Sequence, residues 1–427
     1  MRFRLLLPAL LFCLLCSTVF AQSDTSQIPL KERAYIASRV YASLIANFAH
    51  AQGAPDVDVE AAYRLYLDKA LATDNRRDFS MATMQFLATF RNTHTLLIDR
   101  ELIRQPGPVP FVARFIQGQW VVTSSQSPDL KPGDVLEKID DRSFEQFFSQ
   151  VRPYISASSE YSARHLLFSR LGDMAPCALL FPDSFELTLA GNRKVKIDRR
   201  AAGKASPAST EGRWITPGQV AYIRIPSFFF PGNEKHALEL VRGEFKQARA
   251  IVVDVRGNAG GATPGDLTSS LMDRPYRWWT ESTPVYMPYF RFRASQGDWH
   301  YQPFGEPQFT WRSPAQSPAK DGFTGKLVLL VDGGCNSSCE DFTMPFKDNH
   351  RALIIGQTTS GSTGQPYVVE FDNGMLLLIG AKRASFPDGM PFEGVGIKPD
   401  IEVQPTVEDL ARGRDIALEA ALHALGN

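Results

Sequence analysis

The turn between residues 332 and 340 constrains the fold of this chain more than any other stretch. An apolar run from Lys326 to Val331 precedes the turn, and helix-like sequence from Glu340 to Lys347 follows it. The turn itself reads Asp-Gly-Gly-Cys-Asn-Ser-Ser-Cys-Glu. A strand, a glycine turn, a serine and a helix in this order present a hydroxyl at a strand end beside backbone N–H groups. The pattern indicates a nucleophilic serine at Ser337 or Ser338, or a serine that only caps the helix.

A second glycine turn follows a strand earlier in the chain. We expect a strand at 220–225, an amphipathic helix at 234–249 and a buried strand of the parallel type at 250–255. The last strand runs into Arg-Gly-Asn-Ala-Gly-Gly, where Gly260 and Gly261 expose N–H groups that suit a developing oxyanion. The alternative is a tight turn that only needs positive φ. Alternating strands and helices predict a mixed α/β core from 210 to 427.

The residues before this core divide into two units. Apolar residues recur at helical spacing from Ile28 to Phe90, which predicts an N-terminal helical domain at 22–100. The helical sequence ends in Arg-Asn-Thr-His-Thr-Leu-Leu, which contains Thr93 and His94. A lone histidine of this kind is more often structural than catalytic, so its role stays open at this point.

Residues 101–205 change to strand-like sequence around a Pro-Gly-Asp turn at 132–134. This stretch resembles a PDZ domain, although Asp141 stands where such domains usually carry glycine. The segment 154–181 is longer than a PDZ domain needs, and we expect it to form a helical insertion. PDZ domains bind extended peptides by strand addition. A docking or gating role without peptide binding is the alternative.

An aromatic-rich insertion at 275–320 interrupts the core between two of its strands. The insertion is either a hairpin that packs against the core or a wall or lid of a substrate cleft.

The N-terminus predicts export. Arg2 and Arg4 precede an apolar run from Leu5 to Phe20, and cleavage after Ala21 would remove a signal peptide at 1–21. The run is shorter than the roughly 20 residues of a membrane span. We therefore expect a periplasmic or secreted protein with no stable membrane insertion after cleavage. The 46 basic and 46 acidic side chains balance, which gives no reason to expect a nucleic-acid partner.

Three cysteines remain after the predicted cleavage, namely Cys177, Cys335 and Cys339. Export permits a disulfide across the serine turn, between Cys335 and Cys339. Three buried thiols are the alternative. The spacing is not a zinc pattern, and the sequence implies no metal or organic cofactor.

Taken together, these stretches resemble the tail-specific, C-terminal-processing and tricorn-type serine proteases. Five features follow one another along the chain in the order that is typical of that family. They are Thr-His-Thr-Leu at 93–96, the PDZ-like module, Asp-Val-Arg-Gly-Asn-Ala-Gly-Gly at 254–261, Ser-Ser-Cys-Glu at 337–340 and Glu-Gly-Val-Gly-Ile-Lys-Pro-Asp at 393–400. The resemblance implies a core like the crotonase-like and ClpP-like spiral.

The resemblance also implies roles for individual residues. Ser337 would be the nucleophile, and the N–H groups of Ser338 and of Gly260 or Gly261 would bind the oxyanion. The Lys-type members carry their base about 25 residues after the serine, where this chain has Ser362, and a serine is no base at neutral pH.

The tricorn branch uses a histidine base instead of a lysine. The resemblance to that branch implies that His94 is the base, with Thr93 and Glu393 orienting it. A histidine is a natural base for a serine hydroxyl.

These features favour a serine endopeptidase that hydrolyses periplasmic or secreted polypeptides through an acyl-enzyme, and a homo-oligomer is compatible with them. Two alternatives stay open. The same fold also hosts non-catalytic ligand- or peptide-binding proteins, and the same residues would serve a hydrolase of small esters.

Overall fold

The computed structural model describes residues 26–104, 106–171, 174–201, 208–304 and 307–426, so the predicted signal peptide at 1–21 lies outside the described residues. The α-helices are α1 (Leu30–Asn47), α2 (Val59–Ala72), α3 (Arg76–Ala88), α4 (Arg100–Arg104), α5 (Phe144–Val151), α6 (Glu160–Leu166), α7 (Pro231–Arg242), α8 (Gly265–Leu271), α9 (Pro288–Ser295), α10 (Ser338–Asp348), α11 (Val407–Ala411) and α12 (Ile416–Leu425). The short 3-10 helices are η1 (Ala51–Gly53), η2 (Arg152–Tyr154), η3 (Pro176–Leu180) and η4 (Trp299–Phe304). The strands are β1 (Leu96–Asp99), β2 (Phe111–Ile116), β3 (Gln119–Ser125), β4 (Val135–Ile139), β5 (Arg142–Ser143), β6 (Ser184–Leu189), β7 (Arg193–Asp198), β8 (Glu211–Thr216), β9 (Val220–Arg224), β10 (Ala250–Asp254), β11 (Thr280–Pro284), β12 (Gln308–Arg312), β13 (Lys326–Val331), β14 (Leu353–Gly356), β15 (Pro366–Glu370), β16 (Met375–Gly380), β17 (Arg383–Ser385) and β18 (Ile401–Glu402).

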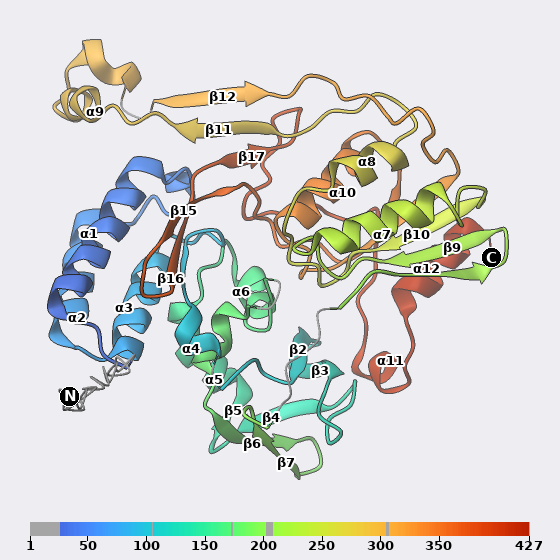
Figure 1. Ribbon diagram of the computed structural model, residues 1–427, viewed down its shortest axis with the longest axis horizontal. Coiled ribbons are helices and arrows are strands. Elements are labelled where there is room, and N and C mark those ends of the chain that lie inside the picture. The colour runs from blue at the N-terminus through green and yellow to red at the C-terminus, as the bar shows by residue number, and fades with distance from the viewer. Residues whose placement is uncertain (1–25, 105, 172–173, 202–207, 305–306, 427) are drawn as a thin grey trace, which may run out of the picture.

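The core is a six-stranded sheet in the order β18-β14-β13-β10-β9-β8. All neighbours in it pair in parallel except β8, which runs antiparallel to β9 at one edge. Alternate residues of the central strands pack against α7, α8 and α10 on one face and against α12 on the other. Coverage of both faces explains why these strands read as continuous apolar runs. The expected mixed α/β fold is confirmed (Figure 1).

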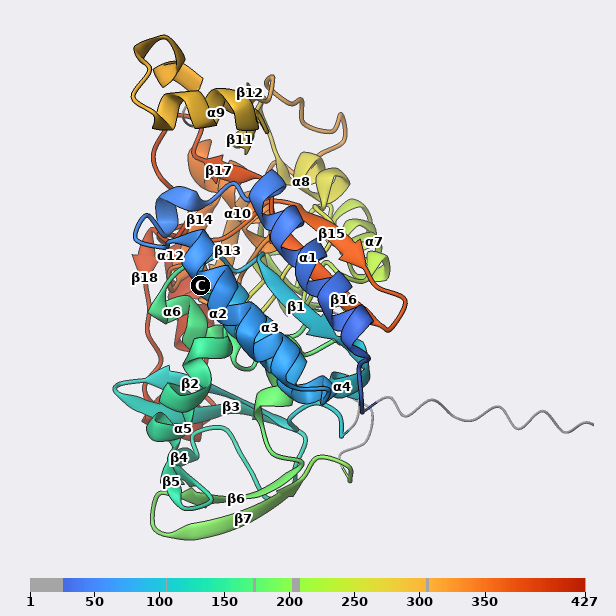
Figure 2. The ribbon, with the colours of Figure 1, turned by 90° about the vertical axis from the view of Figure 1, so that its left-hand side faces the viewer.

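The N-terminal unit is helical on one side and a sheet on the other. Helices α1, α2 and α3 lie beside a three-stranded sheet, β1-β16-β15 (Figure 2). Strand β1 pairs with β16 from Leu96↔Leu378 to Asp99↔Met375, and the two elements share one hydrophobic core with the helices. A hairpin from late in the chain therefore completes the unit that the sequence placed at 22–100.

The residues expected to resemble a PDZ domain, called the PDZ-like module below, contain the antiparallel sheet β2-β3-β4-β6-β7, with β5 paired to β4. The predicted helical insertion at 154–181 contains α6 and η3. Helix α6 contacts the core directly, because the Tyr161 hydroxyl donates to the carbonyl of Thr358 at 2.9 Å and the hydroxyls of Ser162 and Ser360 lie 2.8 Å apart.

The aromatic-rich insertion forms an arm that projects from the core. Strands β11 and β12 pair with each other, and β11 also pairs with β17, while α9 and η4 form the tip at the top of Figure 1. Only part of the insertion packs inside, since Tyr276 and Trp279 are buried. The following aromatic side chains of the arm are exposed: Tyr286, Tyr289, Phe292, Trp299, Phe309 and Trp311.

No helix within the described part of the chain combines the length and the apolar character that a membrane crossing requires.

Candidate active site

Ser337 lies at the turn between β13 and α10 in a conformation that serine rarely adopts. Its φ is 56° and its ψ is −124°. Positive φ at a non-glycine residue is strained and persists only where surrounding contacts impose it. The Ser337 side chain makes no capping hydrogen bond to α10. The helix-cap interpretation therefore does not account for this serine, whose side chain is partly exposed.

A disulfide joins the two ends of this turn. Cys335 and Cys339 are bonded, with Cα atoms 5.3 Å apart, and they bracket Ser337. The disulfide predicted as one of two alternatives is therefore present. The third cysteine, Cys177, is a buried thiol whose pKa burial raises to about 12, so it stays protonated and unreactive.

Glu340 fixes a loop from 359 to 363 against the serine turn. Its buried carboxylate accepts hydrogen bonds from the N–H groups of Gly361 at 2.7 Å and Ser362 at 3.0 Å, and from the hydroxyl of Thr359. Burial raises the pKa of Glu340 to about 8, although the three donors act in the opposite direction. The carbonyl of Ser362 in turn accepts from the N–H of Ser337 at 3.0 Å. The loop and the nucleophile turn are thus one hydrogen-bonded unit.

His94 contacts this unit from the N-terminal domain. Its turn is held by Asn92, whose side-chain oxygen accepts from the N–H of His94 at 3.1 Å. The imidazole Nδ1 lies 3.0 Å from the hydroxyl oxygen of Ser362. Burial, and then the charge of Lys382, lower the pKa of His94 to about 4. If Nδ1–H donates to Ser362, Nε2 carries the lone pair that a general base needs.

The sequence did not assign Ser362 this contact. In the sequence, Ser362 was noted only because it occupies the position where the Lys-type proteases carry their lysine base. Nothing in a polar glycine loop indicates that one of its hydroxyls faces a histidine from another domain.

The two predicted orienting residues have other partners. The hydroxyl of Thr93 lies 3.4 Å from that of Ser158 in the PDZ-like module. The carboxyl of Glu393 lies beside His50, with Oε2 3.8 Å from Nδ1. No hydrogen bond among the described residues joins Thr93 to His94 or Glu393, so the orientation of His94 by these two residues stays a prediction. Sequence reasoning missed His50, which follows α1 and carried no recognisable signal.

The two glycines of the 256–261 turn differ in what their N–H groups do. The N–H of Gly260 donates to the side chain of Asn258 at 2.9 Å. Those of Gly261 and Ser338 donate to no acceptor within the described residues. The Ser338 hydroxyl donates to the carbonyl of Gly261 at 2.5 Å and so joins the two turns. Of the two predicted alternatives for the second oxyanion donor, Gly261 is the one with an unused N–H.

Gly260 allows the two turns to pack closely, which is a different role from donating a hydrogen bond to the oxyanion. A Cβ built on it would lie 2.8 Å from Cβ of Ser337 and 2.9 Å from the backbone nitrogen of Ser338. Its φ is 100°, which side chains disfavour as well. The residue lets the two turns approach closely.

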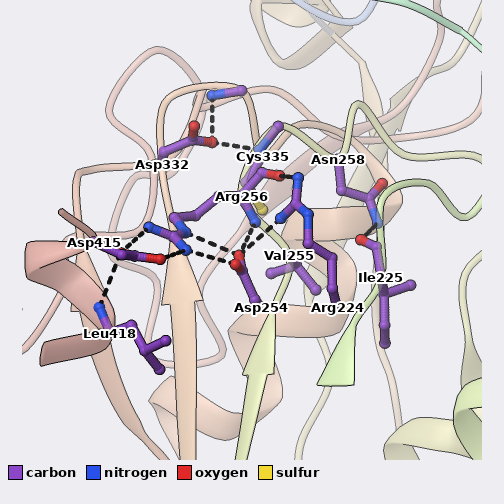
Figure 3. Close-up of polar contacts among 12 residues, drawn as sticks. Arg224, Ile225, Asp254, Val255, Arg256, Asn258, Asp332, Cys335, Asp415 and Leu418 are labelled. Carbon is purple, nitrogen blue, oxygen red and sulfur yellow. Dashed lines mark hydrogen bonds and ion pairs between the residues drawn. The ribbon is translucent and has the colours of Figure 1, made fainter. Parts of the chain in front are cut away.

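Charged residues anchor the start of the 256–261 turn (Figure 3). The side chain of Arg256 lies between two carboxylates and bonds to Asp254 and to Asp415, the N-cap of α12. The carboxylate of Asp332 accepts from the N–H groups of Gly257 and Gly334. These bonds tie the 256–261 turn to both the serine turn and the C-terminal helix.

The two lysines near the turn are engaged elsewhere. Lys382 is paired with Glu281 at 2.5 Å, and Lys347 is paired with Asp400. Asp348, the last residue of α10, pairs with Arg277 at 2.7 Å. Within the described ranges, no group of three or more His, Cys, Asp or Glu side chains is placed to hold a metal ion.

A cavity of about 1090 Å³ lies between the PDZ-like module and the core. Strand β2 and helix α6 form one wall, and the carboxyl ends of β9, β10 and β13 form the other. Asn336 and Ser360 line it, so the cavity reaches the residue next to Ser337. None of the exposed aromatic side chains of the arm lines this cavity, so the arm is not its wall.

Comparisons with known proteins identify relatives of the core. Residues 219–403 match the model of peptidase family S41. A carboxyl-terminal-processing protease of Synechocystis sp. is 27% identical over 224 residues, which cover 52% of this chain and 47% of that protein. The tail-specific protease of Haemophilus influenzae is 28% identical over 171 residues, covering 39% of this chain and 20% of that protein. The chain thus spans about half the length, or less, of these curated relatives.

Solved structures share the fold over nearly the whole chain. Mature CPAF complexed with lactacystin superposes with a TM-score of 0.66 at 15% identity, covering 93% of this chain and 97% of that one. The photosystem II D1 C-terminal processing protease gives a TM-score of 0.53 at 18% identity, with coverage of 92% and 97%.

Proposed function

We propose that this protein is a serine endopeptidase that cleaves polypeptides through an acyl-enzyme, a proposal supported by the match of residues 219–403 to the model of peptidase family S41. The observation that carries the proposal is the geometry of Ser337, whose side chain makes no helix-capping bond and which is held at positive φ. Unused N–H groups of Ser338 and Gly261 lie in the two turns beside it. A nucleophile next to two preorganised donors is the arrangement that acyl transfer requires.

In this proposal each residue has a defined task. His94 removes the proton from the Ser337 hydroxyl as that oxygen attacks the peptide carbonyl, and later returns a proton to the leaving amine. The N–H groups of Ser338 and Gly261 stabilise the oxyanion, where losing one donor costs about 10²–10³ in rate. Ser362 holds His94 through Nδ1. Glu393 supplies the carboxyl that stabilises the imidazolium.

Polypeptides in the periplasm or outside the cell are the proposed substrates. The cavity between the PDZ-like module and the core has a volume of about 1090 Å³ and is lined in part by Asn336, the residue before Ser337, which favours an extended chain over a small ester. The N-terminal sequence supports export.

The experiment is fluorophosphonate labelling of the mature protein, with mass spectrometry of the peptides, alongside hydrolysis of an unfolded protein substrate. We expect one adduct, on Ser337, and loss of both adduct and hydrolysis in Ser337→Ala. His94→Ala should abolish labelling as well. Lys382→Ala is the control and should label normally, because His94 and not a lysine is the base.

Two results would redirect the proposal. No adduct on the folded wild-type protein would favour a non-catalytic binding protein. An adduct on Ser337 with hydrolysis of small esters but of no polypeptide would favour an esterase.

A further inference from the structure

The disulfide between Cys335 and Cys339 closes a small ring of chain around the proposed nucleophile. The two cysteines are four positions apart, so the residues inside the ring are Asn336, Ser337 and Ser338. Ser337 has a φ of 56° in this ring. A positive φ at a serine persists only where the surrounding structure imposes it. A covalent ring of this size imposes such a restraint, because it leaves the residues inside it few other backbone conformations.

Both sulfur atoms lie in a closely packed part of the core. Cys335 and Cys339 are 0% exposed and belong to the hydrophobic cluster that also contains Val255 and Phe342. Bonded sulfurs are about 2 Å apart, whereas non-bonded heavy atoms keep about 3.5–4 Å between them. Two thiols therefore need more room than the disulfide. In a close-packed cluster, the backbone that carries the thiols has to move to provide that room.

Movement of this ring reaches the other parts of the proposed site through backbone hydrogen bonds. The N–H of Asn336 donates to the carbonyl of Asn258 at 3.1 Å, in the turn that carries the second oxyanion donor. The carbonyl of Cys335 accepts from the N–H of Ser360 at 2.9 Å, in the loop that contacts the proposed base. The ring itself contains Ser338, whose N–H is the first oxyanion donor. The disulfide therefore restrains the distances between the nucleophile, the oxyanion donors and the base.

We propose that the Cys335–Cys339 disulfide is a positioning cross-link of the active site, and that the protein gains full activity only when it folds where thiols are oxidised. The proposal rests on the proposed function, in which Ser337 is the nucleophile. As the bond between the two sulfurs forms, the two thiols give up two electrons and two protons to the disulfide of a thiol oxidant, which becomes a pair of thiols. The closed bond is buried, so the folded protein keeps the redox state in which it folded. A chain that folds among reduced thiols before export stays in a form of low activity.

The experiment compares one chain folded in two redox states. The mature chain, residues 22–427, carries Cys177→Ala, so that Cys335 and Cys339 are its only cysteines. It is unfolded and then refolded with oxidised glutathione or with dithiothreitol, and thiol counts after denaturation confirm the two states. We expect fluorophosphonate labelling of Ser337 to be at least tenfold slower in the reduced protein, because displaced oxyanion donors stabilise the transition state less. The kcat for a peptide substrate should fall by the same factor while KM changes little, because neither cysteine lines the cavity.

Two variants separate the bond from the refolding conditions. The double variant Cys335→Ala, Cys339→Ala cannot form the bond, so it should label slowly after refolding under either condition. Cys177→Ala alone should label like the oxidised wild type, because Cys177 lies in η3 and is bonded to no other cysteine. Equal labelling rates of the oxidised and the reduced protein would overturn the proposal. So would a reduced protein without its circular dichroism, since the bond would then hold the fold, or a rise in KM with kcat unchanged.

Hydrogen exchange gives a readout that does not depend on activity. The N–H groups of Asn336 and Ser337 are hydrogen-bonded to carbonyls of other segments. We expect both to exchange at least tenfold faster in the reduced protein, while the amides of α1 keep their protection. Unchanged exchange in the turn would overturn the proposal. If Ser337 is not labelled in oxidised wild-type protein, the proposed function fails, while the exchange rates still decide whether the disulfide holds the turn.

Discussion

At the residue scale, the environment of His94 sets the pH at which the proposed base is available. Burial and Lys382 lower its pKa to about 4, below the ordinary value near 6.5. The neutral imidazole, which is the form that accepts a proton, therefore persists as the pH falls through 6 and 5. We expect the rate of fluorophosphonate labelling at Ser337 to fall by half near pH 4. A half-point near 6.5 would show that His94 is solvated or is not the base.

Ser362 and Thr93 offer two candidates for the residue that orients His94. Only Ser362 contacts the ring, through Nδ1 at 3.0 Å, whereas the hydroxyl of Thr93 faces Ser158. We expect Ser362→Ala to lower kcat about 10- to 100-fold, because an unheld imidazole samples the wrong tautomer and orientation. Thr93→Val, which keeps the side-chain shape, should lower it little. The reverse ranking, measured on variants with wild-type circular dichroism, would favour Thr93 as the residue that orients His94.

At the element scale, the close approach of the 256–261 turn to the serine turn is the feature that substitution can test. An alanine at Gly260 would place Cβ 2.8 Å from Ser337 and 2.9 Å from the Ser338 nitrogen. The turns would have to separate, which would displace the oxyanion donors. We expect Gly260→Ala to lower the labelling rate about 10²-fold or more.

Gly257→Ala is the matched control for backbone strain. Gly257 also has positive φ, 72°, but its Cβ would meet no atom within 4 Å. Its substitution costs about 1 kcal/mol of conformational strain without moving the serine turn. Similar losses of activity in the two variants would mean that strain, and not the distance between the turns, sets the rate.

The local elements of this chain were predictable because their patterns are local. The buried run at 326–331 and the two glycine turns indicated strands and their ends, and the structure has β13, β10 and the Ser337 turn there. The sequence left Ser337 open as a helix cap, because a cap and a nucleophile share the same residues. Backbone geometry, with φ at 56° and no capping bond, argues against the helix cap.

At the scale of the whole molecule, the decisive contacts join residues that no local pattern connects. Strand β1 pairs with β16, which places the His94 turn against the late part of the chain. The contacts of His94 with Ser362 and of His50 with Glu393 both depend on that pairing of distant segments. The family resemblance predicted His94 as the base and Glu393 as a residue that orients it. It gave no role to His50 or to Ser362.

The buried His50–Glu393 pair also predicts how the stability of the whole molecule depends on pH. In the unfolded chain, Glu393 and His50 have lost their protons above about pH 6.5. Burial raises the pKa of Glu393 well above its ordinary value, so the folded protein keeps the proton of this carboxyl to a higher pH than the unfolded chain does. The folded state then binds more protons than the unfolded state, so stability falls as the pH rises, by roughly 1 kcal/mol per pH unit for each such proton, until the folded pair titrates.

Glu393→Gln removes that proton, so its midpoint of thermal unfolding should decline less steeply than that of the wild type as the pH rises toward the raised pKa of Glu393. The slope should not vanish, because Glu340, with its pKa raised to about 8, contributes in the same direction in both proteins. Glu419→Gln, at an exposed carboxyl of α12, controls for the change in net charge. Parallel midpoint curves for wild type and Glu393→Gln would mean that the carboxyl is ionised in the folded protein at neutral pH, with His50 as a neutral neighbour.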